Sequence, residues 1–396
     1  MNSLKYLAAA LLGLLLFLSL SLFGLALTLN MTVLNADFIT SQLEKLDIAA
    51  LTEEAEIQPA IEEFPELAQY PELESYVKDA IIEHEGEIKE RVSIAIHDIY
   101  DYLLGKSQSL DLALVLGDSV LDPELTISIL NDIDLSPLVE ELFREQVPME
   151  PGPGGFRIEP YLDDVATELE PWLKEQASNA IGPIYSYILG QSQSLELRIS
   201  LEPIKESLEN TLRQAFLEAP PAELAGLSEA ELEQAFDRLY TEFATEIPSA
   251  LVFDPLDPEI PAQVAQALAE AETTLEETRE YISIFQTVYG ILFGLILLLI
   301  AGIILITRQV RGSSRILGIT FLAYGTLVLV ASLIAVNAVR TQVVQQPDIP
   351  ASIQAWLSGL LSSAISPLQI LCSVLIAAAV ALLAVSFVYK GRPSPE

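Results

Sequence analysis

Four long apolar segments without a charged residue constrain this chain more than any other feature. A helix needs roughly 20 apolar residues to cross the hydrocarbon core of a membrane, and each segment reaches that length. The sequence therefore predicts a mainly α membrane protein with four transmembrane helices. They cover Leu7–Leu27, Ile284–Ile306, Ile316–Val336 and Leu368–Val388.

Charge is distributed along the chain in step with these segments. Residues 31–280 hold 54 of the 56 acidic and 13 of the 20 basic residues, a net charge of −41, and the remainder carries +5. A single large acidic region between the first and second apolar segments is typical of one soluble domain on one side of a membrane.

Basic residues in short flanking segments indicate which side is cytoplasmic. They stand before the first segment, between the second and third, and after the fourth. The pattern predicts cytoplasmic N- and C-termini in a multi-pass plasma-membrane protein, with residues 29–282 extracytoplasmic. These residues are Lys5, Arg308, Arg311, Arg315, Lys390 and Arg392.

The first apolar segment has two interpretations. It is longer than the 7–15 apolar residues of a signal peptide, which favours a retained anchor. Gly24-Leu25-Ala26 resembles a weak cleavage site, so a cleaved signal peptide stays the alternative.

An internal repeat marks the acidic region. Residues 95–112 (AIHDIYDYLLGKSQSLDL) and 180–197 (AIGPIYSYILGQSQSLEL) are identical at 12 of 18 positions at an offset of 85. Such similarity indicates two copies of one unit. We therefore expect an extracytoplasmic α+β domain built from two repeats, 29–150 and 151–260.

In each copy the spacing of the apolar residues changes at a glycine. Before it, apolar residues recur at helical spacing, and Gly105 and Gly190 fall where a helix would end in a left-handed residue. After it, leucines alternate along 110–116 and 195–201, which predicts a half-buried strand. We hypothesise that the two strands join one small sheet.

Local signals predict the other elements of this region. Residues 146–160 form a Pro/Gly linker. Ser228-x-x-Glu231 is a capping box that opens a helix through Phe243, and the prolines of 247–261 indicate a loop.

The C-terminal part is predicted in three pieces. A stalk helix over 261–307 is predicted to continue into the second span, because no proline stands between Ala262 and Ile306. This helix would be about 65–70 Å long. Residues 308–396 hold spans three and four with an outer loop over 338–367. Within that loop, 351–366 suits a short helix, either on the membrane surface with Trp356 at headgroup level or packed beneath the acidic domain.

The motifs that carry chemistry are weak. Gly117-Asp118-Ser119-Val120 resembles a hydrolase nucleophile block, but both histidines, His84 and His97, precede Ser119. Gly105-Lys106-Ser107 lacks the upstream glycine of a phosphate-binding loop. We interpret the two motifs as turns and predict no catalytic residues, no cofactor and no enzyme activity.

Metal-binding signals are equally sparse. Glu83, His84, Glu85 and Glu87 lie on one predicted helix, where we expect a solvated face. Asp132-Ile133-Asp134 and Asp254-Pro255-Leu256-Asp257-Pro258-Glu259 do not match an EF-hand loop. We predict no ordered metal site, and weak divalent-cation binding stays open.

Other function classes are disfavoured. The spans contain no ionisable acidic or basic residue of the kind that ion-coupled transporters place in the membrane. The acidic region would repel phosphate, so no nucleic-acid partner is expected. The single cysteine, Cys372, lies in the fourth span, where an inert thiol is expected, and it excludes an intrachain disulfide.

Two resemblances concern the layout. Thr32-Val33-Leu34-Asn35-Ala36-Asp37-Phe38 after the first span, and strand-to-helix pieces like Leu195–Leu212, resemble a group of uncharacterised bacterial multi-pass membrane proteins. That resemblance implies one N-terminal span, a large helix-rich extracytoplasmic domain and three C-terminal spans.

The layout also resembles permease subunits of ABC exporters that move lipoproteins or macrolides. Those subunits have a longer cytoplasmic segment between spans two and three than Arg308–Arg315 here. We expect a non-enzymatic, membrane-anchored binding or cell-envelope structural protein, with the lipid bilayer and another envelope or membrane protein as partners. The alternatives are a transport-related, permease-like subunit and an unrecognised enzyme.

Overall fold

The fold is taken from a computed structural model of the 396-residue chain. It describes residues 2–54, 71–133, 135–136, 162–192, 195, 197–218, 220, 224, 226–246, 249–253, 259–344 and 350–388. The predicted linker 146–160 and residues 254–258 of the second acidic cluster lie outside the described residues. The contacts divide the chain into a bundle unit, residues 1–54, 92–110 and 272–396, and a second unit, residues 55–91 and 111–271.

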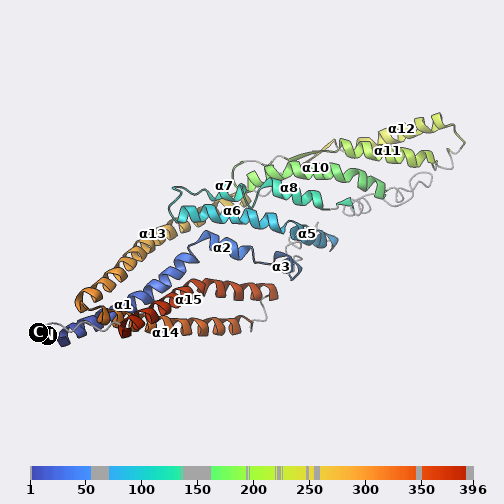
Figure 1. Ribbon diagram of the computed structural model, residues 1–396. Helices are drawn as coiled ribbons and strands as arrows, with labels where there is room; N and C mark the ends of the chain where they lie inside the picture. The colour runs from blue at the N-terminus through green and yellow to red at the C-terminus, as the bar shows by residue number, and fades with distance from the viewer. Residues whose placement is uncertain are drawn as a thin grey trace. The chain divides into compact units, whose positions relative to one another are not determined.

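The bundle unit is built on four long helices (Figure 1). All four are long and apolar enough to cross a membrane, which confirms the predicted mainly α, multi-pass membrane class. The second of them runs unbroken for 49 residues, so the predicted continuous helix from Ala262 to Ile306 is confirmed. They are α1 (Asn2–Met31), α13 (Glu259–Thr307), α14 (Val310–Val344) and α15 (Ala351–Val388).

Apolar side chains from all four helices form the core of this bundle. Leu16, Ile303, Tyr324 and Cys372 are fully buried. Phe23 of α1 stacks on Tyr289 of α13 with ring centroids 5.3 Å apart. Leucines and isoleucines on the outer faces stay exposed, as expected where lipid rather than water is the neighbour.

The contacts also give the directions of the helices. Leu12 lies near Gly302, whereas Phe23 lies against Tyr289, so α1 and α13 are antiparallel. The start of α1 therefore lies at the same end of the bundle as Thr307, the last residue of α13.

The connection between α13 and α14 is shorter than predicted. Only Arg308 and Gln309 lie between the helices, so most of the segment Arg308–Arg315 between the two apolar spans belongs to α14. The side-chain hydroxyls of Thr307 and Ser313 are hydrogen-bonded to each other, and Ser313 Oγ also donates to the carbonyl of Gln309. These local bonds let α14 begin two residues after α13 ends.

The prediction of a separate short helix over 351–366 is also wrong, because α15 continues through Pro367 from Ala351 to Val388. Its first turns pack against α2 (Ala36–Leu43) and α3 (Ile48–Glu54). Trp356 Nε1 donates to the carbonyl of Gln42 at 2.8 Å. The Glu54 carboxylate accepts from the backbone N–H of Ser352, in the first turn, at 3.3 Å. The segment is thus tied to α2 and α3 within the bundle unit.

The end of α6 (Glu85–Leu103) completes the bundle unit. Tyr102 and Leu103 pack with Ile282 of α13 in a small core. The guanidinium of Arg279 lies 4.5 Å from the Tyr102 ring centroid and donates to the carbonyl of Ser107 at 3.1 Å. The α6 end and α13 are therefore fixed to each other.

The second unit is also helical. Apolar residues of α10, α11 and α12, including Leu169, Phe216 and Phe236, share one core. Prolines lie inside α10 at 171 and 183. The helices are α5 (Pro71–Glu83), the start of α6, α7 (Leu112–Gly117), α8 (Pro123–Asp132), α10 (Leu162–Ile188), α11 (Glu202–Glu218), α12 (Glu229–Glu246) and the start of α13.

The repeated sequence forms the same turn twice. Gly105 and Gly190 have φ angles of +75° and +71°. Lys106 N donates to the carbonyl of Asp101, and Gln191 N to that of Ser186, both at 2.8 Å. This six-to-one bond with a left-handed glycine is a Schellman helix end, so the predicted left-handed glycines are confirmed.

After that turn the two copies diverge. Residues 112–117 form α7, because the Asp111 carboxylate caps the helix by accepting from Leu114 N at 3.0 Å. Only the second copy forms a strand, β1 (Leu197–Ser200). The prediction of a domain made from two helix–turn–strand copies, with paired strands, is therefore wrong.

The partner of β1 comes from elsewhere. β1 pairs antiparallel with β2 (Ala250–Phe253), which lies within the segment 247–261 predicted as a loop. Helix α12 begins at Glu229 as the capping box predicts, and Glu231 accepts from Ser228 N at 2.9 Å. The helix extends to Glu246, three residues beyond the predicted end.

Candidate functional site

The serine of the hydrolase-like motif is buried in a turn. Ser119 follows α7, is 1% exposed, and donates its hydroxyl to the carbonyl of Val115. A nucleophile needs an accessible oxygen next to a base. The motif is thus the predicted turn, although it follows a helix rather than a strand.

Lys106 of the phosphate-loop-like motif points to its own helix end. Its Nζ lies 2.8 Å from Asp101 Oδ1, and the group is exposed. The surrounding backbone is the Schellman turn, whose N–H groups point back to α6. This geometry accounts for Gly105-Lys106-Ser107 without a ligand.

His84 connects two segments of the second unit. Its Nε2 lies 2.7 Å from Asp132 Oδ2 at the end of α8, and its Nδ1 lies 3.6 Å from Glu87. Across the part of the chain that the structure describes, no three His, Cys, Asp or Glu side chains group as metal ligands. Its role here is to join α8 to the junction of α5 and α6.

His97 holds the α1–α2 turn in the bundle unit. Its Nδ1 lies 2.9 Å from the carbonyl of Ser93, and its Nε2 lies 3.2 Å from Asp37 Oδ1. The bond to Ser93, followed by that to Asp37, raises the pKa of His97 above 6.5 although burial opposes the change. Tyr100 adds a 2.7 Å bond to the carbonyl of Val33.

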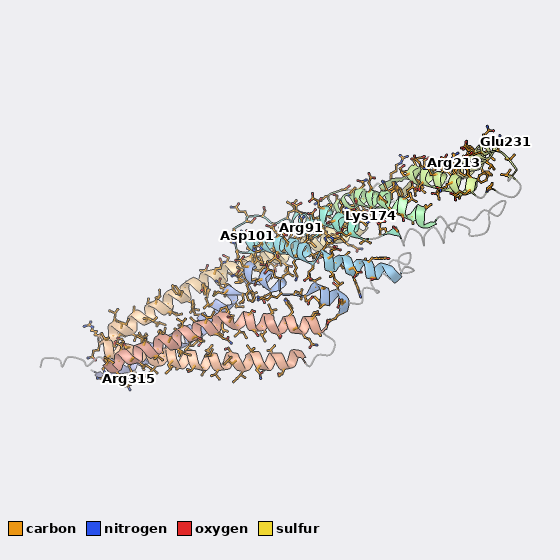
Figure 2. The ribbon with its side chains drawn as sticks, turned by 45° about the vertical axis from the view of Figure 1, so that its right-hand side comes forward. Arg91, Asp101, Lys174, Arg213, Glu231 and Arg315 are labelled. Carbon is orange, nitrogen blue, oxygen red and sulfur yellow. The ribbon has the colours of Figure 1, made fainter. Side chains whose placement is uncertain are left out.

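A polar groove lies between α11 and α12 in the second unit. It has a volume of about 860 Å³. Figure 2 shows Arg213 on α11. Lining residues are Lys205, Glu209, Arg213, Asp237, Tyr240, Thr241, Ala244, Thr245 and Ser249.

The centre of this groove is an ion-paired arginine. Arg213 lies 2.5 Å from Glu209 and 2.8 Å from Asp237, and its guanidinium stands 4.8 Å from the Phe236 ring centroid. The bond to Glu209, and then that to Asp237, raises the pKa of Arg213. Glu209 and Asp237 therefore balance the charge of the Arg213 guanidinium within the groove.

The groove's phenol and hydroxyl are also engaged within the protein. Tyr240 donates to the carbonyl of Lys205, and Thr241 Oγ1 donates to the carbonyl of Asp237 at 2.6 Å. Burial, and then the charges of Glu209 and Glu202, raise the pKa of Tyr240. The groove therefore joins α11 to α12, and its described lining residues present no set of groups directed at a reacting atom.

A smaller hollow of about 560 Å³ lies beside α10. Lys174 Nζ lies 2.8 Å from Glu170 and donates to the carbonyl of Asn131, also at 2.8 Å. Burial has the largest single effect on the pKa of Glu170 and raises it. The bonds from Lys174, Ser136 and Leu135 together still lower its pKa, so these groups stabilise the α8–α10 contact.

The sequence did not predict either of these two hollows. The Glu209–Arg213 and Glu170–Lys174 pairs are readable as i, i+4 partners, but Asp237 and Asn131 come from other helices. Comparison of the chain with protein-family models, curated proteins and solved structures gave no match.

Proposed function

We propose that this protein is a membrane-anchored scaffold that presents a helical, acidic body outside the cytoplasm to a protein partner of the cell envelope. The observation that supports the proposal is the length of α13, whose 49 residues exceed the roughly 20 that a membrane span needs. Its residues 259–283 precede the apolar segment and extend for about 37 Å at 1.5 Å per residue. A helix of this length suits a support.

Contacts at the base of this helix favour the same role. Arg279 is fixed to the carbonyls of Ser107 and Gln108, and Ile282 packs with Tyr102 and Leu103. The extramembrane part of α13 is therefore braced by α6 where it meets the span.

We further propose that the helix end at Thr307 faces the cytoplasm and that residues 29–282 lie outside. Arg308, Arg311 and Arg315 stand at that end, as expected from the distribution of basic residues in membrane proteins. Arg340, at the opposite end of α14, is the single basic residue in the short outer flank.

Retention of the first helix belongs to the proposal. Leu16 and Leu20 of α1 are buried in the bundle core. A Cβ on Gly24 would overlap the Tyr324 hydroxyl, so α1 and α14 are in close contact. Cleavage near Ala26 would remove these core residues, and we infer that α1 stays as an anchor.

The permease-like alternative has less support. Its motivation is the layout of one span, a large domain and three spans. A permease needs a cytoplasmic segment that can contact an ATPase, and only Arg308 and Gln309 separate α13 from α14.

Affinity purification from native membranes tests the role. The full chain, solubilised without denaturation, should retain an envelope protein in a stoichiometric complex. An ATPase retained in that proportion would instead establish the transport alternative. Arg213→Gln, which breaks the α11–α12 ion pairs, tests whether the second unit makes the contact, and exposed Arg238→Gln on the same helix pair is the matched control.

Cysteine labelling tests the topology. Cys372 is buried and is the single cysteine of the chain. Cys372→Ala therefore gives a chain without cysteine. In that background a membrane-impermeant maleimide should label Ser228→Cys in intact cells and should label Gln309→Cys only after the membrane is opened. The reverse pattern would contradict the proposed orientation while leaving the bundle itself unaffected.

A further inference from the structure

Three arginines surround the turn between α13 and α14. Arg308 lies in the turn, and Arg311 and Arg315 are one helical turn apart on α14, so their side chains share a face. All three are exposed. Figure 2 shows Arg315 at the end of the bundle.

Within the described segments at this end of the bundle, these guanidinium groups have no acidic neighbour in the sequence. No acidic residue stands between Glu280 and Asp348 in the sequence. The other chain segments at this end, the start of α1 and the end of α15, also lack acidic residues over 2–36 and 349–388. By contrast, Arg91, Arg213 and Lys174 in the second unit are each paired with carboxylates.

The backbone at Arg308 is an independent observation. Its φ angle is +47°, and it is the single non-glycine residue with positive φ in the described part of the chain. Arg308 N donates to the carbonyl of Ile304 at 3.0 Å, which makes it the left-handed residue that ends α13, a position that glycine fills most easily. A charged residue held in a strained conformation suggests a function for its side chain.

The turn is also rigid. Thr307 Oγ1 donates to Ser313 Oγ, which in turn donates to the carbonyl of Gln309. Ser386 Oγ of α15 donates to the carbonyl of Arg311 at 3.3 Å. The three arginines are therefore presented on a fixed frame at the end of a helical bundle, beside the positive N-terminal end of α14.

We propose that Arg308, Arg311 and Arg315 bind the phosphate group of an anionic phospholipid headgroup. Guanidinium groups bind phosphate through paired hydrogen bonds, and clusters of basic residues at the end of a span attract anionic lipids. The proposal rests on insertion of the bundle in a membrane and not on its orientation, so the labelling experiment and the lipid experiment can fail separately.

Lipid retention by the purified full chain tests the proposal. Native mass spectrometry from detergent should show dioleoyl phosphatidylglycerol retained in preference to dioleoyl phosphatidylcholine. Removal of each arginine should weaken that retention about fivefold, the factor that about 1 kcal/mol per basic residue gives. Equal retention of the two lipids by the natural chain would overturn the proposal.

The choice of variants separates folding from charge. Arg308→Gly relieves the left-handed strain, so it should fold at least as well and still lose retention. Arg311→Gln/Arg315→Gln should lose more, whereas Arg340→Gln, at the other end of α14, should behave as the natural chain. If Arg340→Gln and the double variant lost retention equally, the site would not be at this turn.

Inorganic phosphate distinguishes the source of the phosphate group. The phosphatidylglycerol should raise the melting temperature of the natural chain, and inorganic phosphate at matched ionic strength should not. An equal rise with inorganic phosphate would identify a site for a soluble anion and would overturn the assignment to lipid.

Discussion

Single residues set the tightest contacts in the bundle, and Gly24 is the clearest example. A methyl group there would overlap the Tyr324 hydroxyl and would lie 2.9 Å from Leu368 Cδ1. The same hydroxyl is buried and has no hydrogen-bond partner among the described residues. Close helix approach at a small residue is a general feature of membrane bundles.

Gly24→Ala should therefore destabilise the bundle by about 1–3 kcal/mol, the usual cost of overpacking. A thermal melt of the detergent-solubilised protein measures the change. Gly290→Ala on α13 is the control, since a Cβ there meets nothing within 4 Å. Adding Tyr324→Phe should restore part of the loss, and equal melting temperatures for the two alanine variants would refute the close contact.

His97 makes a contact whose strength should depend on pH. Both ring nitrogens face acceptors, Ser93 O and Asp37 Oδ1, so the contact favours the protonated ring. Because the folded-state pKa is raised above 6.5, the stabilisation is complete below pH 6.5 and is lost as the pH rises through the folded-state value.

Asp37→Asn should thus lower the melting temperature at acidic pH and have little effect at alkaline pH. The His97 side chain is 45% exposed, so a small effect is expected. Exposed Asp98→Asn on α6 is the comparison. A pH-independent difference between Asp37→Asn and the natural chain would argue against the protonated contact.

At the scale of elements, the helix ends show where local sequence is sufficient. The sequence Ile-Tyr-x-Tyr-(Leu/Ile)-Leu-Gly-x-Ser-Gln-Ser forms the same turn in both copies because its glycine adopts positive φ and its N–H groups bond back to the helix. The element after the turn depends on available partners. An isolated strand has unpaired N–H and C=O groups; 197–200 pairs with β2, whereas 112–117 satisfies its groups as a capped helix.

Gly105→Ala and Gly190→Ala should each destabilise the protein by about 1 kcal/mol, since a side chain disfavours positive φ. Gly182→Ala, inside α10 with open space around it, should have the opposite sign through helix propensity. Denaturant unfolding compares the three variants, and a stabilising Gly190→Ala would contradict the left-handed turn.

The extramembrane part of α13 offers a second element-scale test. Ala267→Pro should break the helix there, at a cost of about 3 kcal/mol of helix stability, and should increase protease cleavage within 259–270. Ala267→Ser is the control. Unchanged cleavage in the proline variant would mean that this part of α13 is not a continuous helix.

On the scale of the whole molecule, net charge is the dominant property. A chain with a formal charge of −36 repels itself, and salt screens that repulsion. Sodium chloride should therefore raise the melting temperature, and calcium at matched ionic strength should add little. A distinctly larger rise with calcium would establish the cation site that the acidic clusters left open.

The sequence by itself determined the membrane segments, the 49-residue helix α13 and the glycine turns, because apolar length, absence of proline and positive φ act within one segment. Only the tertiary structure decided the rest. Residues 110–116 and 195–201 have the same alternation of apolar residues. The first segment forms a helix capped by Asp111, whereas the second forms a strand that pairs with β2. Likewise the start of α15 is held by residues distant in sequence, since Glu54 accepts from Ser352 N and the carbonyl of Gln42 accepts from Trp356 Nε1. Arg308, Arg311 and Arg315 form one cluster because α14 begins at Val310.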